Sequence, residues 1–204
     1  QAAIADLPRE EMLATVSYLY VAWELNQQVF VLGNGGSAST ASHIANDLSK
    51  ATIVPGMPRL KVISLTDNVA LMTAWANDTS YEEIFRQQLE NLLEPGDVVL
   101  GISASGNSPN VIRAMEFARQ HCAVTIGWTG MNGGQLKFVT DLCVRVPTDD
   151  VGMIESAHLV LDHLVTRQLQ QQIHSEQSAR ATQLRFEAHL EGPALAGSSG
   201  LAET

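Results

Sequence analysis

Two turns rich in glycine and serine are the first segments of the chain that could do chemistry. Residues 33–37 have the sequence Gly-Asn-Gly-Gly-Ser, and residues 103–108 have the sequence Ser-Ala-Ser-Gly-Asn-Ser. Glycine lets the backbone approach a ligand closely, and hydroxyls together with free amides at a helix start can surround an anion. We therefore expect a phosphate site. The absence of Lys and Arg from both turns favours a small phosphate monoester over a triphosphate.

Each turn alone is also compatible with a structural role. The first would be a tight turn between a strand and a helix, and in the second Ser108 followed by Pro109 suits a helix N-cap. Two such turns on different strands of one parallel sheet favour ligand binding, because ligands of this architecture collect at the carboxyl ends of the strands.

Imidazole and carboxylate side chains form a third candidate group. His43 and Asp47 are one helical turn apart, and a C-terminal helical segment carries Glu155, His158, Asp162 and His163. Such groups on two helices could act as a general acid and base or bind a divalent metal. Each group alone fits a solvated helix face with a structural histidine better than a functional site, because such residues normally lie on helix surfaces.

The elements that must position these residues alternate along the chain. Short runs rich in Val, Ile and Leu predict buried strands at 29–32, 60–65, 98–102, 124–126 and 142–146. Helical patterns are expected near 12–23, 37–50, 68–75, 81–93, 109–120 and 152–173, with a short helix within 131–137. Asp6 and Pro8 indicate the start of the first helix. This order predicts a doubly wound α/β fold with a five-stranded parallel sheet flanked by helices.

Length and composition limit the classes of protein. The 204 residues, 45% of them hydrophobic, suit one globular domain. A net charge of −10 without a basic run gives no electrostatic support for nucleic acid or anionic membranes, and no apolar run approaches a membrane span of ~20 residues. We expect a cytoplasmic protein.

The chain is expected to divide into a domain over residues 1–174, including an N-terminal helix, and a polar C-terminal tail over 175–204, although 177–190 could form a helix. Cys122 and Cys143 lie in or beside apolar runs, so we expect two reduced thiols in the core rather than a disulfide.

Together these residues resemble the sugar isomerase (SIS) domain family, and within it the phosphoheptose isomerases. The resemblance runs from Met12 to Ile173. It rests on the two turns, on His43 with Asp47, on Ala76-Asn77-Asp78, and on the segment from Ile154 to His163. It implies a homotetramer with active sites between subunits and a small-molecule sugar phosphate as substrate. The implied reaction interconverts sedoheptulose 7-phosphate and glycero-manno-heptose 7-phosphate.

The resemblance also assigns roles to residues. Ser103, Ser105 and Ser108 match phosphate-binding serines, while Asn34, Gly35, Ser37 and Asp78 match positions around the sugar. His43, Asp47, Glu155 and His163 match the residues around a metal ion, for which zinc is expected. Asp47 and Glu155 replace the family's glutamate and glutamine, and Ala104 replaces a usual threonine.

The implied mechanism is aldose–ketose isomerisation through an enediolate, with His163 serving the oxygens and Asp47 as the catalytic base. If the metal holds Asp47, Glu155 becomes the base, and the sequence does not choose between them. Two alternatives stay open: an isomerase of another sugar phosphate, and a non-catalytic module similar to a tetrameric relative that binds the replication initiator protein. The acidic residue at Asp47 and the retained His163 favour an enzyme.

Overall fold

The computed structural model describes residues 7–190, whose five strands form one parallel sheet in the order β2-β1-β3-β4-β5. The strands are β1 (Gln28–Gly33), β2 (Lys61–Ser64), β3 (Val98–Ser103), β4 (Val124–Thr129) and β5 (Leu142–Arg145). Their register pairs Val29 with Val98, and Val98 with Val124. The predicted doubly wound α/β fold is confirmed.

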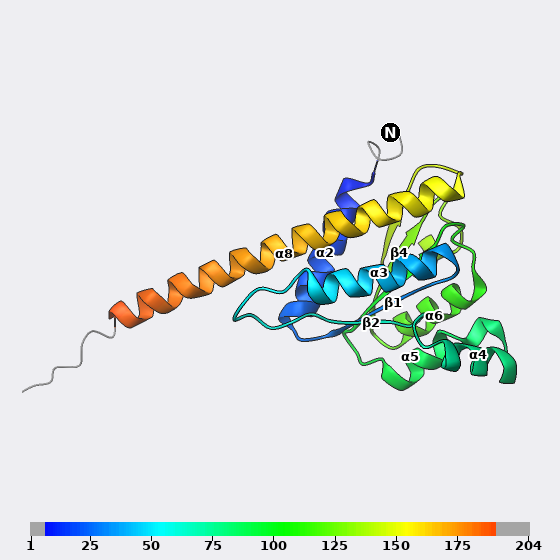
Figure 1. Cartoon of the computed structure of the whole chain (residues 1–204), viewed down its shortest axis with the longest axis horizontal. Coiled ribbons are helices and arrows are strands. Elements are labelled where there is room, and N and C mark those ends of the chain that lie inside the picture. Colours follow the sequence, from blue (N-terminus) through cyan, green and yellow to red (C-terminus); the bar gives the residue numbers. More distant parts are fainter. Residues whose placement is uncertain (1–6, 191–204) are drawn as a thin grey trace, which may run out of the picture.

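Helices cover both faces of the sheet (Figure 1). One face carries α2 (Arg9–Glu24), α3 (Gly36–Lys50) and α8 (Val151–Leu190). The other carries α4 (Val69–Asp78), the 3-10 helix η1 (Tyr81–Glu83), α5 (Arg86–Leu92), α6 (Pro109–Gln120) and α7 (Leu136–Val139). Two apolar layers result, one on each side of the sheet.

The central strands are apolar on both sides because each side contributes to a different layer. In β1, Val29 and Val31 pack beneath α3 and α8, whereas Phe30 and Leu32 pack on the opposite side. The expectation that all five strands are buried is wrong for the two outer ones. Ile63 in the edge strand β2 is 40% exposed, so the helices on its face of the sheet do not cover it completely.

Two helices differ from the expected boundaries. The segment expected as one helix over 81–93 is divided into η1 and α5. The closing helix α8 has 40 residues and continues through His174 to Leu190, which makes it about 60 Å long. Its last part projects beyond the sheet (Figure 1). The expected helix start at Asp6 and the end of the expected tail lie outside the described residues.

Both cysteines are free, as expected, but neither lies in the core. Cys122 is exposed, in the turn that joins α6 to β4 with a positive φ of 61°. Cys143 is half-buried on the edge strand β5. The expectation of burial is wrong because apolar neighbours in sequence do not place a turn residue or an edge residue inside.

Across residues 7–190, the helices lack the combination of length and apolar character that crossing a membrane requires.

His158 on α8 packs against the end of β4 and forms a hydrogen bond to it. Its side chain is 1% exposed, its Nε2–H donates to the carbonyl oxygen of Thr129 at 3.3 Å, and its ring lies 6.0 Å from that of Trp128. Burial lowers the pKa of His158 from 6.5 to about 4, since desolvation outweighs the hydrogen bond to Thr129. The imidazole is therefore neutral in the folded protein at neutral pH.

This burial predicts an acid-sensitive fold. Between pH 6.5 and about 4 the unfolded chain binds a proton at His158 that the folded chain does not bind. The contribution of His158 to the free energy of unfolding should therefore fall by up to about 3 kcal/mol as the pH decreases through this interval. Denaturant unfolding at several pH values measures this change in the free energy of unfolding. His158→Gln should flatten the pH dependence, and an equal slope in both proteins would contradict the assignment.

Candidate functional site

The two glycine- and serine-rich turns line one pocket at the carboxyl ends of β1 and β3. Its volume is about 240 Å³, which is below the ~300–1,000 Å³ of pockets for drug-sized ligands and suits a small molecule. The lining residues are Asn34, Ser37, Ile102, Ser103, Ala104, Ser105, Ser108, Met131, Val151 and Glu155. Sequence residues 70 positions apart thus meet because β1 and β3 are neighbours in the sheet.

The serine turn presents hydroxyl groups that the fold itself uses little. Ser103 ends β3 and is 3% exposed, and its Oγ lies 3.0 Å from Oγ of Ser108. Ser108 occupies the N-cap position of α6, yet its side chain makes no capping hydrogen bond. The purely structural alternative, an N-cap serine, therefore does not account for this hydroxyl. Ser105 Oγ accepts the backbone N–H of Asn107 at 3.2 Å and can still donate its own proton.

A second loop holds the serine turn in place by close backbone contact. Gly106 has a φ of 65°, and a Cβ at this position would collide with the carbonyl group of Gly133. The N–H of Leu136 donates to the Gly106 carbonyl at 2.9 Å, and the N–H of Gln135 donates to Asn107 Oδ1 at 3.0 Å. Glycine is required at 106 by both its conformation and its neighbours.

Asn34 is fixed by two residues that the sequence analysis missed. Its amide and that of buried Asn110 exchange two hydrogen bonds of 2.8 Å, and Tyr81 donates its hydroxyl proton to Asn34 Oδ1 at 3.0 Å. One N–H of the Asn34 amide has no partner among the described residues and is available to a ligand. No motif in the sequence marks Asn110 or Tyr81, because their positions depend on the packing of α6 and η1.

The start of α3 faces the Glu155 carboxylate. Gly35, with a φ of 55°, precedes the helix, and Ser37 in its first turn is buried. A Cβ at Gly36 would collide with the carboxylate of Glu155, which therefore lies directly against the helix N-terminus. Free amides there stabilise negative charge. Asp78 is exposed at the end of α4, where it accepts a hydrogen bond from Asn77, and it does not line the pocket.

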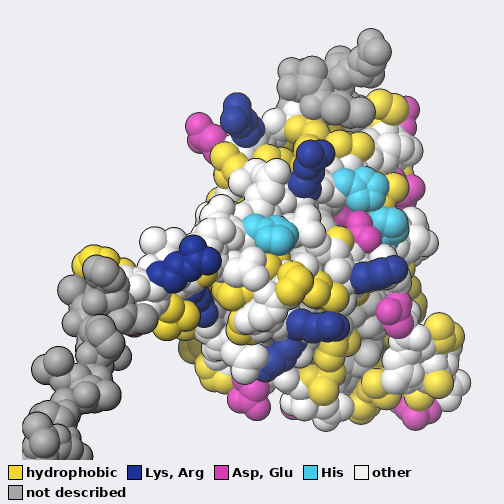
Figure 2. All heavy atoms as spheres, turned by 60° about the vertical axis from the view of Figure 1, so that its left-hand side comes forward, with side chains coloured by type: hydrophobic (Ala, Val, Ile, Leu, Met, Phe, Trp, Pro, Cys, Tyr) yellow, Lys and Arg dark blue, Asp and Glu magenta, His cyan; other side chains and the backbone are white. Residues whose placement is uncertain are grey.

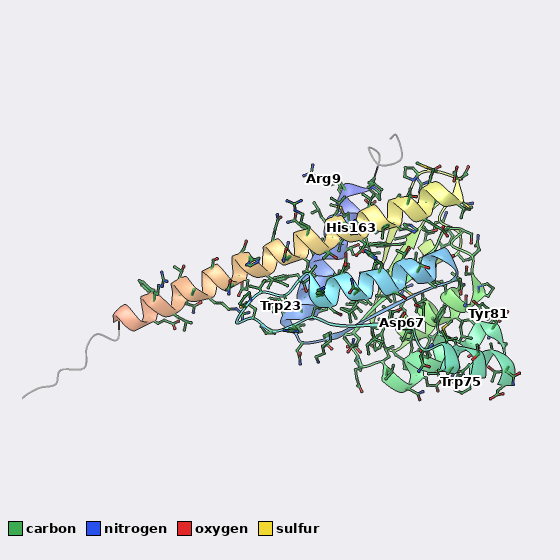
Figure 3. The ribbon with its side chains drawn as sticks, viewed as in Figure 1. Arg9, Trp23, Asp67, Trp75, Tyr81 and His163 are labelled. Atoms are coloured by element: carbon green, nitrogen blue, oxygen red, sulfur yellow. The ribbon has the colours of Figure 1, made fainter. Side chains whose placement is uncertain are left out.

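A cluster of four titratable side chains lies between α3 and α8. Nε2 of His43 is 3.2 Å from Nε2 of His163, 3.5 Å from Oδ2 of Asp47 and 3.8 Å from Oδ2 of Asp162. One ligand atom from each residue lies within 4.8 Å of the others. Figure 3 shows His163 on α8 beside α3, and Figure 2 shows histidines next to an acidic side chain at the surface.

Asp162 is the buried member of this cluster. It is 0% exposed, Oδ1 accepts a hydrogen bond from Thr166 at 3.3 Å, and Oδ2 has no hydrogen-bond partner in the described structure. Burial, followed by the charge of Asp47, raises the pKa of Asp162 from 3.8 to about 6. Two carboxylates and two imidazoles around an unpartnered oxygen are a donor set that fits a divalent cation such as zinc.

The structure gathers the expected residues into two neighbouring groups. Asn34, Ser37, Ser103, Ser105, Ser108 and Glu155 line the pocket, whereas His43, Asp47 and His163 form the cluster. Glu155, expected beside the other metal-site residues, is absent from the described cluster, and Asp162 takes the fourth place. The sequence analysis noted Asp162 on the closing helix but gave it no role.

Comparisons with known proteins identify the family of the chain. Residues 2–130 match the SIS domain model. A phosphoheptose isomerase from Trichlorobacter lovleyi is 37% identical over 75% of this chain and 78% of its own length. A probable phosphoheptose isomerase from Thermoplasma acidophilum is 39% identical over 78% of this chain and 87% of its own length. The solved structure of a phosphoheptose isomerase from Francisella tularensis superposes with a TM-score of 0.77 at 29% sequence identity. The superposition covers 83% of this chain and 90% of that structure's chain.

The contact between Gly106 and Gly133 predicts an unequal cost of two alanine substitutions. Gly56 also has a positive φ, 79°, but a Cβ there would meet open space. Gly56→Ala should therefore cost only the backbone strain, about 1 kcal/mol of unfolding free energy. Gly106→Ala should cost about 1–3 kcal/mol more because the backbones must also separate. Denaturant unfolding of both variants measures the two losses of unfolding free energy. Equal losses would show that the contact between Gly106 and Gly133 does not stabilise the two loops.

Proposed function

The chain belongs to the SIS domain family, and from this premise we propose that it is a phosphoheptose isomerase that interconverts sedoheptulose 7-phosphate and D-glycero-D-manno-heptose 7-phosphate. Its relatives that bear this name cover most of the chain, which confirms the family resemblance in the sequence and the expectation of an enzyme. The observation that carries the proposal is the pocket in which the glycine turn and the serine turn meet.

The phosphate is assigned to Ser103, Ser105 and Ser108. Their hydroxyls converge at the start of α6, a helix of 12 residues whose free amides add positive potential. Glu155 is the one charged residue among those that line the pocket. A phosphate in this turn is therefore held by neutral donors.

The sugar is assigned to the residues at the start of α3. Asn34 is oriented by Asn110 and Tyr81, and Ser37 lines the pocket one turn further along. Gly35 permits the close approach, and Asp78, which lies outside the pocket, is retained as a sugar contact only by its match to the family.

The proton transfers are assigned to groups between α3 and α8. His163 serves the hydroxyl and carbonyl oxygens, and either Asp47 or Glu155 removes the proton from carbon. We propose that His43, Asp47 and His163 hold zinc together with one further carboxylate. Bound zinc would supply a positive charge that stabilises the enediolate oxygen.

Assembly, location and domain division remain proposals. Apolar side chains are exposed on α2, at its C-cap and on α8, at Leu13, Tyr18, Val21, Leu25, Leu159 and Leu164. A groove between these helices is lined by Tyr20 and Val21 on one side and by Gln172 on the other. These features support a homotetramer with active sites between subunits. We further propose a cytoplasmic location and a domain that ends near residue 174.

The activity test compares one serine that lines the pocket with one that does not. Ser108→Ala should raise the KM for sedoheptulose 7-phosphate about tenfold or more, because a hydrogen bond to a charged group contributes about 1.5–3 kcal/mol. Ser156 on α8 is exposed and bonds only to its own helix, so Ser156→Ala should leave the KM unchanged. If wild-type protein with added zinc converts no heptose phosphate, the non-catalytic module is favoured instead.

The assembly test uses two exposed apolar residues on opposite faces of the sheet. Light scattering should report four chains for the wild type. Val21→Glu on α2 should reduce this mass, since it places a charge in the proposed interface, whereas Phe138→Glu on α7 should not. Val21 is 46% exposed and Phe138 is 66% exposed, so neither change disturbs the core. A monodisperse monomer at all concentrations would contradict the proposed assembly.

A further inference from the structure

Helices α3 and α8 run side by side in the same direction and meet at two levels. At the first level, Gly36 at the start of α3 contacts the carboxylate of Glu155. At the second level, His43 lies next to Asp162 and His163. Seven residues separate Gly36 from His43, and seven separate Glu155 from Asp162. The levels are therefore about 10 Å apart along each helix, at 1.5 Å per residue.

The second level contains a complete set of ligand atoms without Glu155. His43, Asp47, Asp162 and His163 offer two nitrogens and two oxygens within 4.8 Å of one another. Four ligands are the usual number for zinc in proteins. A fifth ligand from the first level is not needed to fill the site.

The buried carboxylate of Asp162 destabilises the fold unless a cation is bound beside it. Its Oδ2 is buried, lacks a hydrogen-bond partner among the described residues, and points to within 3.8 Å of His43 Nε2. A buried carboxylate oxygen without a partner is strongly unfavourable, and the nearby Asp47 adds repulsion. A bound cation would satisfy this oxygen and remove the repulsion together.

Glu155 has a different environment. Its carboxylate is half-buried, lies against the N-terminus of α3, and is the one carboxylate among the residues that line the sugar-phosphate pocket. The partial positive charge at this helix N-terminus is a favourable neighbour for a carboxylate, so Glu155 does not need a metal as its partner. The carboxylate therefore faces the ligand pocket while the cluster one level further holds its own four ligands.

We propose that Asp162, and not Glu155, completes the metal site with His43, Asp47 and His163, and that Glu155 is the proton-transfer carboxylate of the sugar-phosphate pocket. This inference rests on the proposed isomerase function for the role of Glu155. The assignment of Asp162 stands on the cluster alone. It also gives Asp47 and His163 to the metal, so Glu155 is left as the side chain that carries the transferred proton.

The proton transfers balance without any further reactant. Glu155 takes the proton from C1 of the ketose, and the C–H electron pair forms the C1–C2 double bond while the carbonyl oxygen on C2 takes the proton of the O1 hydroxyl group. The negative charge of the enediolate is then on O1. Glu155 returns its proton to C2 while the O1 electrons form the aldehyde, so the product is the aldose and Glu155 regains its starting state.

The experiment measures zinc affinity and turnover in three variants of the full chain. Zinc alone is titrated into metal-free protein in competition with a chelator, without substrate. Asp162→Asn and Glu155→Gln each remove one charge with little change in shape. Asp67→Asn is the matched control, because Asp67 lies in the turn after β2, bonds to Ser42 and Thr66, and is outside the cluster.

The proposal gives a distinct result for each variant. Asp162→Asn should weaken zinc binding more than tenfold, since loss of even an outer-shell partner costs about 10–100-fold. Glu155→Gln should keep zinc affinity within about threefold of the wild type while kcat falls about 100-fold or more, the usual contribution of a general base. Asp67→Asn should change neither quantity.

The opposite effects on zinc affinity and kcat in these variants would overturn the proposal. If Glu155→Gln weakens zinc binding more than tenfold, Glu155 is a ligand, and this result is readable even if Asp162→Asn does not fold. Unchanged zinc affinity in Asp162→Asn, no zinc binding by the wild type, or unchanged kcat in Glu155→Gln also refutes it. If the wild type binds zinc but converts no heptose phosphate, the proposed function fails, while the affinity ranking still decides whether Asp162 is a ligand.

Discussion

The register between α3 and α8 is the constraint on which the site depends. Both helices lie on the same face of the sheet, and each contributes at least one residue at the pocket and two at the cluster, two turns further on. A slip of one helix by a single turn would move its side chains by 5.4 Å and separate both sets of partners. His158 opposes such a slip because it joins α8 to the end of β4 at a position between the two levels.

The candidate site combines two chemically different environments, the pocket lined by the serine turn and the cluster of imidazoles and carboxylates. The serine turn offers uncharged donors that are held by a neighbouring glycine loop, and its geometry depends on backbone contacts rather than on flexible side chains. The cluster concentrates imidazoles and carboxylates around a buried oxygen. The pocket and the cluster thereby use different donors, so a ligand held by the neutral hydroxyls of the pocket does not compete for the imidazoles and carboxylates of the cluster.

The sequence predicted the sheet and both turns because their signals are local. Apolar runs mark the central strands, and glycine with serine marks the points where β1 and β3 end. Exposure of the outer strands could not be read in the same way, since burial depends on how far the helices extend over each face of the sheet. Ile63 shows this, because its apolar side chain in the edge strand β2 is only partly covered.

The choice between Glu155 and Asp162 needed information that lies between the helices. Asp162 is seven residues after Glu155, a spacing that returns to nearly the same face of a helix, so both side chains can face α3. Helical spacing does not show which of them lies opposite His43, because that depends on the offset of α8 along α3. The sequence therefore identified the participating helices, whereas the offset that places Glu155 beside Gly36 and Asp162 beside His43 comes from the packing of the two helices.

A phosphate pocket without a basic residue has a consequence for how its ligand arrives. The chain carries a net charge of −10, and Glu155 adds negative potential at the pocket itself, so a dianionic sugar is repelled until it reaches the helix amides. Ions in solution screen that repulsion beyond about 8–10 Å but hardly weaken hydrogen bonds within the pocket. Capture of substrate by this protein should thus become faster as ionic strength rises, the opposite of the behaviour of sites that attract phosphate with lysine or arginine.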